Sequence, residues 1–140
     1  MKLTLEKASI IADGTLARAR EMKYRPMTVA VLDEGGHLKA LKREDGSSIL
    51  RPQIATGKAW GALGMGESSR HLGERLKDRV AFLGALSDMA GGKVVPVPGG
   101  VLILRDGEII GAVGVSGGAG EEDEACAIEG IKRAKLDYQV

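Results

Sequence analysis

The chain has 140 residues, of which 44% are hydrophobic and 28% are charged, as in ordinary globular domains. Twenty Lys and Arg against 19 Asp and Glu leave a net charge of +1, which removes the usual electrostatic case for a nucleic-acid-binding or membrane-surface protein. No apolar run approaches the roughly 18–20 residues of a membrane span, and the first residues lack the apolar core of a signal peptide. One cysteine cannot form an internal disulfide. We therefore expect a soluble cytoplasmic domain.

Glycine is unusually abundant, since its 21 copies are about twice the usual share of roughly 7%. The glycines are spread through apolar segments, so the backbone turns tightly and often, or lets another group approach it closely. Aromatic residues make up only 3% of the chain, and the core must therefore consist mainly of Ala, Val, Ile and Leu.

The first part of the chain predicts a helix followed by a hairpin. Apolar residues recur every three or four positions over residues 5–22, behind a candidate N-cap at Thr4, which predicts an amphipathic helix that ends before Pro26. Residues 27–33 are an apolar run and residues 37–42 alternate between apolar and polar. A glycine turn separates these two segments, so they predict a β-hairpin with one wet face on its second strand.

The middle of the chain predicts helices over residues 52–65, 69–76 and 78–89. The first of them is rich in Gly and Ala between Ala55 and Gly66, which would let it lie close against a neighbour. Close packing of this kind gives one physical reason to expect a homo-oligomer.

The last part of the chain predicts three extended segments and a final helix. Residues 93–97 and 101–104 read as extended, and an Asp-Gly turn leads to a return strand over residues 108–115. A helix should run from Glu121 to about Leu136. Two hairpins combined with helices at both ends and in the middle predict a single α+β domain over residues 1–140, with a mainly antiparallel sheet.

Candidate site residues are few, and the two histidines come first. His37 should lie just after the hairpin turn, and His71 near the start of a short helix. Either imidazole could ligate a metal or a haem iron or transfer protons, although lone histidines are more often plain surface residues. Lys58, on the helix of small residues, could meet an anionic ligand in a crevice or simply face solvent.

The turn at residues 117–120 leads from a strand into a helix, as phosphate-binding turns do. Four acidic residues occupy the first helical turn here, and they would repel a phosphate, so a tight turn with a charge-optimised helix start is the favoured reading. The same run, Glu121 to Glu124, could hold a cation only if its carboxylates converged, which consecutive helical positions do not favour. Cys126 lies close to these carboxylates, which argues against a reactive thiolate.

Four groups of residues also occur in a specific order and spacing: residues 27–38, residues 57–59, residues 98–101, and residues 111–117 followed by Asp123 and Glu124. This ordered set resembles the GlcG/HbpS family, also called haem-binding, which is related to the C-terminal domain of PduO-type corrinoid adenosyltransferases. The resemblance implies a three-layer α/β/α sandwich with a profilin-like, mainly antiparallel central sheet, and it implies homo-oligomers. Some members of the family bind haem, while others have no settled activity.

Three hypotheses of function remain open. The first is a module that binds haem or another tetrapyrrole at a subunit interface, with His37 or His71 as the axial ligand. The second is a small catabolic enzyme, an isomerase or hydrolytic accessory acting on an organic acid. The third is an assembly or regulatory subunit that binds no small ligand.

The enzyme hypothesis requires groups that bind a carboxylate and move a proton. Lys58 would bind the carboxylate and His71 would transfer protons. Backbone N–H donors would come from two glycine pairs, Gly99 with Gly100 and Gly117 with Gly118.

Overall fold

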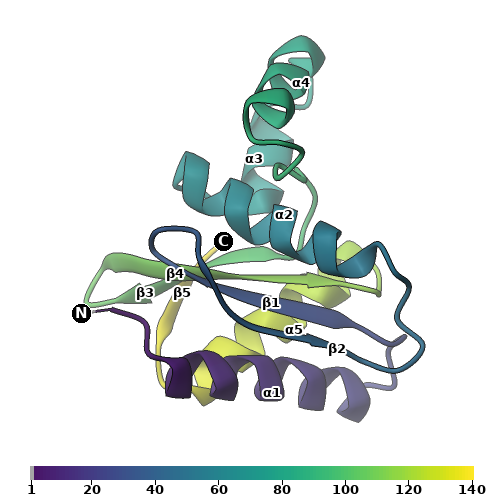
Figure 1. The fold of residues 1–140 in the computed structure, drawn as a ribbon, viewed down its shortest axis with the longest axis vertical. Helices are drawn as coiled ribbons and strands as arrows, with labels where there is room; N and C mark the ends of the chain where they lie inside the picture. Colours follow the sequence, from purple (N-terminus) through teal and green to yellow (C-terminus); the bar gives the residue numbers. More distant parts are fainter. Residues whose placement is uncertain (1) are drawn as a thin grey trace.

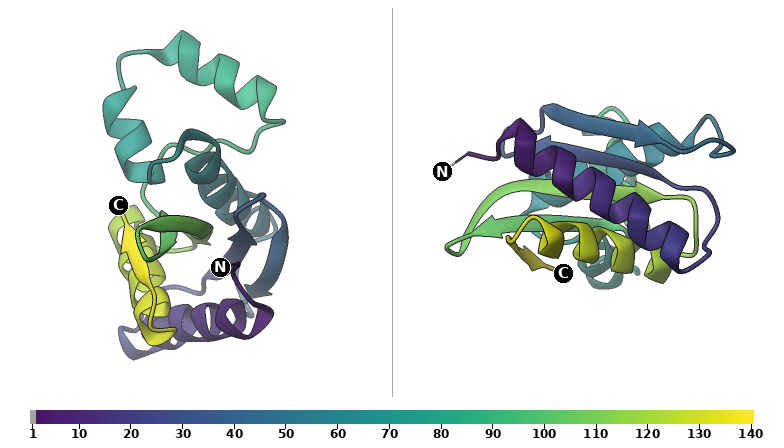
Figure 2. Two further views of the ribbon diagram at one scale, coloured as in Figure 1. Left: turned by 90° about the vertical axis from the view of Figure 1, so that its left-hand side faces the viewer. Right: turned by 90° about the horizontal axis from the view of Figure 1, so that it is seen from below.

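The computed structural model describes residues 2–140 and shows a five-stranded antiparallel sheet between two layers of helices (Figure 1). In chain order the elements are α1 (Leu5–Glu21), β1 (Thr28–Asp33), β2 (Leu38–Arg43), α2 (Arg51–Met65), α3 (Ser69–Arg75), α4 (Val80–Met89), β3 (Gly100–Arg105), β4 (Glu108–Ser116), α5 (Gly120–Arg133) and β5 (Asp137–Gln139). The strand order is β2-β1-β4-β3-β5. Helices α1 and α5 cover one face of the sheet and α2 covers the other, so the predicted α/β/α sandwich is confirmed (Figures 1 and 2).

Helix α1 forms where the apolar spacing predicts it. The side-chain oxygen of Thr4 accepts a hydrogen bond from the backbone N–H of Lys7 at 3.1 Å, which satisfies one of the donors left free at a helix start. Ala8, Ile11 and Ala12 are fully buried against the rest of the chain. The helix ends at Glu21, four residues before the Arg25-Pro26 pair begins.

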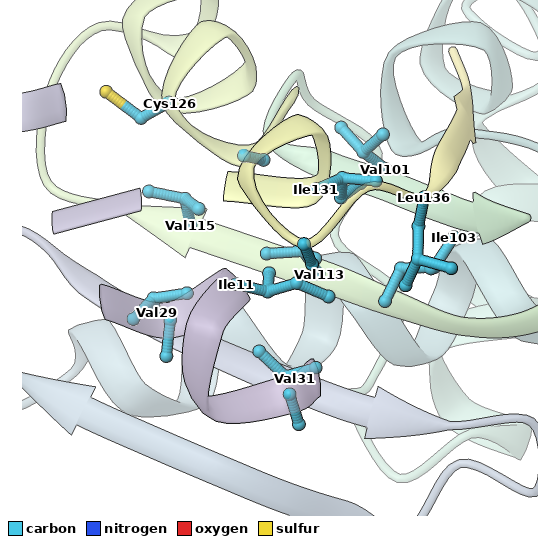
Figure 3. Close-up of a cluster of buried hydrophobic side chains, with 14 of the residues drawn as sticks. Ile11, Val29, Val31, Val101, Ile103, Val113, Val115, Cys126, Ile131 and Leu136 are labelled. Atoms are coloured by element: carbon cyan, nitrogen blue, oxygen red, sulfur yellow. The ribbon is translucent and has the colours of Figure 1, made fainter. Parts of the chain in front are cut away.

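The main core lies between the sheet and the layer of α1 and α5 (Figure 3). Alternate residues of three strands point into it, since successive side chains of a strand face opposite sides. These residues are Val29 and Val31 of β1, Val101 and Ile103 of β3, and Val113 and Val115 of β4. Ile11 of α1 and Ile131 of α5 pack against these strand residues from the helix layer, and each such aliphatic side chain contributes roughly 1.5–3 kcal/mol on burial.

On the opposite face of the sheet, glycines stand where α2 crosses the strands. Gly100 of β3 pairs with Gly114 of β4, and neither has a side chain to separate helix from sheet. A Cβ added at Gly114 would overlap the carbonyl oxygen of Ala55, and one at Gly100 would overlap that of Lys58. The glycines therefore let the backbone of α2 rest directly on the strands.

The small residues of α2 are used within this chain. The Gly57 Cα faces Val95, and that of Gly61 faces Val94 of the segment that returns to β3. Ala55 and Ala59 are fully buried. The helix therefore does lie close against its neighbours, as predicted, but these neighbours belong to the same chain.

Helices α3 and α4 form an arm that stands away from the sandwich (Figure 2). The base of the arm is fixed by Ser69, whose hydroxyl accepts from the N–H of Gly100 at 2.7 Å and donates to the carbonyl of Val97 at 2.6 Å. Helix α4 is apolar, yet none of its 10 residues is buried. In a globular domain an apolar helix normally buries one face, so this one is unpartnered within the chain.

Two segments differ from the sequence expectation. Residues 93–97 are not a strand, because Val94 and Val95 pack on α2 instead of pairing with the sheet. The last helix ends at Arg133 rather than near Leu136, since Lys135 adopts a positive φ of 59° and turns the chain into β5. Across the part of the chain that the structure describes, no helix combines the length and apolar character needed to cross a bilayer.

Candidate functional site

The turn between β1 and β2 holds the first candidate residue, His37, with its imidazole against a carboxylate. Nδ1 of His37 lies 3.1 Å from Oδ1 of Asp33. The same oxygen accepts the backbone N–H groups of Gly35 and His37, each at 3.0 Å. Burial opposes ionisation of Asp33, but these hydrogen bonds outweigh it and hold the pKa of Asp33 below its ordinary value.

The imidazole of His37 is 80% exposed and lies over Gly35. A Cβ on Gly35 would come within 2.7 Å of the ring, so a side chain at this position would displace the imidazole from its present place. On the other side of the turn, Gly36 contacts the indole of Trp60, with a φ of 81° that favours glycine. The turn is therefore held between an imidazole and an indole.

A hollow of about 270 Å³ adjoins this turn, and we call it the His37 hollow. Its lining residues are Lys2, Leu3, Asp33, Glu34, Gly35, His37 and Lys39. The hollow combines an oriented imidazole with two lysines and two carboxylates, and its one apolar residue, Leu3, is buried.

His71, the second candidate, lies on α3 and is 54% exposed. Its nearest carboxylate is Glu67, with 3.6 Å between Nδ1 and Oε2, which is too long for a hydrogen bond. Glu67 is instead bonded to the guanidinium of Arg75, whose Nε donates at 3.0 and 3.2 Å. The structure places the two histidines on separate elements with different surroundings.

Lys58 lies in the interior and reaches from α2 to α5. Its ammonium donates to Oδ2 of Asp123 at 3.1 Å and to the carbonyl of Val115 at 2.8 Å. The two side chains are only 4% and 2% exposed. Burial lowers the pKa of Lys58, opposed by the nearby Asp123 carboxylate, and burial raises the pKa of Asp123, opposed by the Lys58 charge. Lys58 therefore does not face solvent, and that it binds an anionic ligand stays a prediction.

The candidate glycines gather around the same ion pair, and two of their N–H groups bond within the protein. The N–H of Gly118 donates to Oδ1 of Asp123 at 2.9 Å, and that of Gly100 donates to Ser69. Gly99 has a φ of 129°, and a Cβ there would lie 2.8 Å from Nζ of Lys58. Gly117 has a φ of 151° and abuts the carbonyl of Pro26. That these glycines bind a ligand stays a prediction.

The acidic run diverges into separate contacts. Glu122 accepts the N–H of Ala119 at the helix start, Asp123 pairs with Lys58, and Glu124 accepts from Nε of Arg70 on α3. Within residues 2–140 the structure brings together no group of three or more His, Cys, Asp or Glu side chains that could hold a metal ion. The Cys126 thiol is buried, and burial with the Asp123 charge raises its pKa to about 11, which keeps it protonated at neutral pH.

The sequence analysis did not predict the contacts of two carboxylates, that of Asp123 with Lys58 and that of Asp33 with His37. Asp123 is separated from Lys58 by 65 positions, and no local pattern links them. Asp33 had a detectable signal, because an Asp before a two-glycine turn can accept N–H groups of that turn. A histidine directly after such a turn can then reach the same carboxylate.

Comparisons with known proteins show relatives that match most of the chain. Residues 3–132 match the family model for the haem degrading protein HbpS-like family. Protein GlcG of Escherichia coli strain K12 is 38% identical over 115 residues, covering 81% of each chain. The corrinoid adenosyltransferase PduO of Salmonella typhimurium is 32% identical over 110 residues, which cover 79% of this chain but only 32% of that one. The chain thus spans about a third of the length of this relative.

Among solved structures, the crystal structure described as the PduOC:heme complex matches with a TM-score of 0.89. The match covers 100% of both chains at 26% sequence identity. The similarity therefore includes the α3–α4 arm and the β1–β2 turn as well as the sandwich.

Proposed function

This chain belongs to the HbpS-like family, and on that premise we propose that it binds haem. The observation that carries the proposal is the match over its full length to a structure described as a haem complex. Haem needs an iron ligand, apolar contact with the ring and cations for its propionates, and this chain has residues of each of these types. His37 and His71 are the candidate iron ligands, and exposed apolar side chains lie on α4 and at Leu38.

We place the haem at a contact between two copies of the chain. The hollow formed by residues of α1 and β2 has about 560 Å³, but its lining is mostly charged. It is lined by Leu16, Arg20, Pro26, Lys42, Arg43, Glu44 and Asp45. Arg20 already contacts Glu44, and Lys42 already contacts Asp13. The His37 hollow is below the roughly 300–1,000 Å³ usual for ligand pockets and is likewise lined mostly by ionisable side chains, so neither hollow of a single chain accommodates the ring.

Helix α4 is the surface that we propose for assembly. Val80 and Met89, at its two ends, are each 75% exposed, and Phe82, Leu83 and Leu86 are only partly covered. Monomers rarely leave a large exposed apolar surface uncovered. A second copy of the arm would bury it, because a symmetric dimer brings the same patch of both subunits together.

We expect the double variant Val80→Glu/Met89→Glu to dissociate the oligomer. Both side chains are largely exposed in the single chain, so the substitutions should leave the fold intact while placing charges in the apolar contact. The mass in solution, measured by light scattering after gel filtration, should fall to that of one chain. The matched control is Met22→Glu, which is 49% exposed at the end of α1 and should leave the mass unchanged. A wild-type chain that is itself monomeric would contradict this assembly.

A hemin titration tests the ligand. We expect saturable binding with a shifted Soret band at a fixed ratio of hemin to chains. The Val80→Glu/Met89→Glu monomer should bind at least about tenfold more weakly, because one copy cannot cover the ring. Weak absorbance that grows without saturation in the wild type would overturn the proposal.

A further inference from the structure

A small hollow lies between the start of α2 and the segment that leaves α4, and we call it the Lys93 hollow. Its lining residues are Pro52, Gln53, Thr56, Gly91, Gly92 and Lys93. Its volume is about 270 Å³, which is below the roughly 300–1,000 Å³ usual for ligand pockets, so a ligand that fills it must be small.

One side of the hollow is open and carries no polar side chain. A Cβ placed on Gly91 or Gly92 would have no heavy atom within 4 Å, so the space above both glycines is free. The ring of Pro52 adds hydrocarbon surface to the lining. This side therefore suits a short hydrocarbon group, which leaves water favourably in proportion to the apolar area it buries.

The hollow is held in shape by packing on α2. Gly57 of α2 has no side chain, and a Cβ there would come within 2.7 Å of the Val95 side chain and 3.6 Å of the Cα of Lys93. The N–H of Lys93 donates to the carbonyl of Ala90 at 3.2 Å. A ligand thus meets a formed site, and its binding does not have to order the segment.

Lys93 is the charged residue among those that line the hollow. Its Nζ lies 4.7 Å from the centroid of the Trp60 ring, and this cation–π contact orients the ammonium. Within residues 2–140 the structure pairs Lys93 with no carboxylate. The His37 hollow, by contrast, mixes its lysines with Asp33 and Glu34. An anion in the Lys93 hollow is attracted by the ammonium and meets no carboxylate among the lining residues.

Two uncharged polar side chains, those of Gln53 and Thr56, complete the lining. In the part of the chain that the structure describes, neither side chain has a hydrogen-bond partner. Thr56 and Trp60 are four positions apart on α2, so they share the face of the helix on which the ammonium of Lys93 lies. A carboxylate accepts hydrogen bonds from an ammonium, a hydroxyl and an amide NH2 group alike.

From this size, charge and lining we propose that the Lys93 hollow binds a small monocarboxylic acid. Its carboxylate pairs with Lys93, and its short hydrocarbon part lies over Gly91 and Gly92. A second carboxylate would find no further cation among the lining residues, so the hollow selects against dicarboxylates. The site lies beyond the proposed haem function and does not depend on it.

Trp60 makes the binding measurable, because it is the single tryptophan of the chain and the Lys93 ammonium lies over its ring. The probe is isovalerate, titrated at low ionic strength because salt screens exposed charges. We expect a saturable change in tryptophan fluorescence in the millimolar range. Isovaleramide has the same shape without the charge, and acetate lacks the hydrocarbon part, so each should bind at least about tenfold more weakly.

Variants of Lys93 test the assignment, with binding also followed by saturation-transfer NMR of the ligand, which does not rely on the tryptophan. Lys93→Met keeps the hydrocarbon stem but removes the charge, and it should weaken isovalerate binding at least about tenfold. Lys93→Arg should restore binding to within about threefold of the wild type, since a guanidinium also stacks on an indole and pairs with a carboxylate. The matched control is Lys39→Met in the His37 hollow, which should bind isovalerate as the wild type does.

Three results would overturn the proposal. The first is isovalerate binding that does not saturate in the wild type. The second is equal affinity for isovalerate and isovaleramide, or for isovalerate and acetate, because the hollow would then recognise no charge or no hydrocarbon. The third is a Lys93→Met protein that binds isovalerate as tightly as the wild type does while its circular dichroism spectrum is unchanged.

Discussion

Replacing Asp123 with alanine should lower the free energy of unfolding by about 3–5 kcal/mol, because it leaves a buried ammonium without its counter-charge. Lys58 would keep one hydrogen bond, to the carbonyl of Val115, in an interior position that is 4% exposed. Equilibrium unfolding in urea measures the loss, at one fixed protein concentration so that assembly does not alter the comparison.

Asp123→Asn keeps one of the two hydrogen bonds. Its amide oxygen can still accept the N–H of Gly118, but its NH2 group then faces the Lys58 ammonium, so the loss of stability reports both the missing charge and the missing hydrogen bond to Lys58. The double variant Lys58→Met/Asp123→Leu removes both charges and should recover most of the stability, since apolar replacements for buried ion pairs are often neutral or stabilising. Equal losses in the single and double variants would show that the pair does not act as a unit.

The pH dependence of the single variants should have opposite signs. Burial already lowers the pKa of Lys58 below 10.5, and removing Asp123 takes away the charge that opposes this shift. The unfolded state then binds more protons than the folded state between the two pKa values, so the deficit of Asp123→Ala shrinks as pH rises. In Lys58→Met the lone Asp123 keeps a raised pKa, the folded state binds the extra proton, and the deficit shrinks as pH falls.

The elements with clear periodicity were predictable from sequence, and the exceptions have local causes. The apolar spacing predicts α1, the apolar run predicts β1 and the alternation predicts β2, whereas the three-layer arrangement follows from the family resemblance. β5 escaped because a strand of three residues carries no measurable alternation, and because Lys135 ends the helix with a positive φ but without a glycine. Residues 93–97 read as a strand by composition, but tertiary packing on Gly57 and Gly61 decided their conformation.

The contacts of the candidate site residues could be predicted only where the two contacting residues are close in sequence. Asp33 and His37 are four positions apart across one turn, so their contact follows from the turn. Lys58 and Asp123 meet only because α2 and α5, on opposite faces of the sheet, both reach the end of β4 at Val115. No local sequence pattern links these two residues, so the sequence alone predicts Lys58 as a surface or ligand-binding residue.

Gly114→Ala should cost about 3 kcal/mol of stability or prevent folding, although it adds one methyl group. The added Cβ would overlap the carbonyl oxygen of Ala55 and lie 3.0 Å from the amide nitrogen of Ala59. Both atoms belong to the backbone of α2, so no side chain can rotate away, and overpacking of this kind falls at or above the usual range of roughly 1–3 kcal/mol. Thermal unfolding followed by circular dichroism measures the loss.

Gly84→Ala on α4 is the matched control. Nothing lies within 4 Å of its Cβ position and its φ is ordinary, so alanine should stabilise the helix by roughly 0.5–1 kcal/mol. A Gly114→Ala protein as stable as the wild type would mean that α2 can lift from the sheet at no cost. The glycines of β3 and β4 matter because their missing side chains let α2 rest on the strands, and from that position Lys58 of α2 reaches Asp123 of α5.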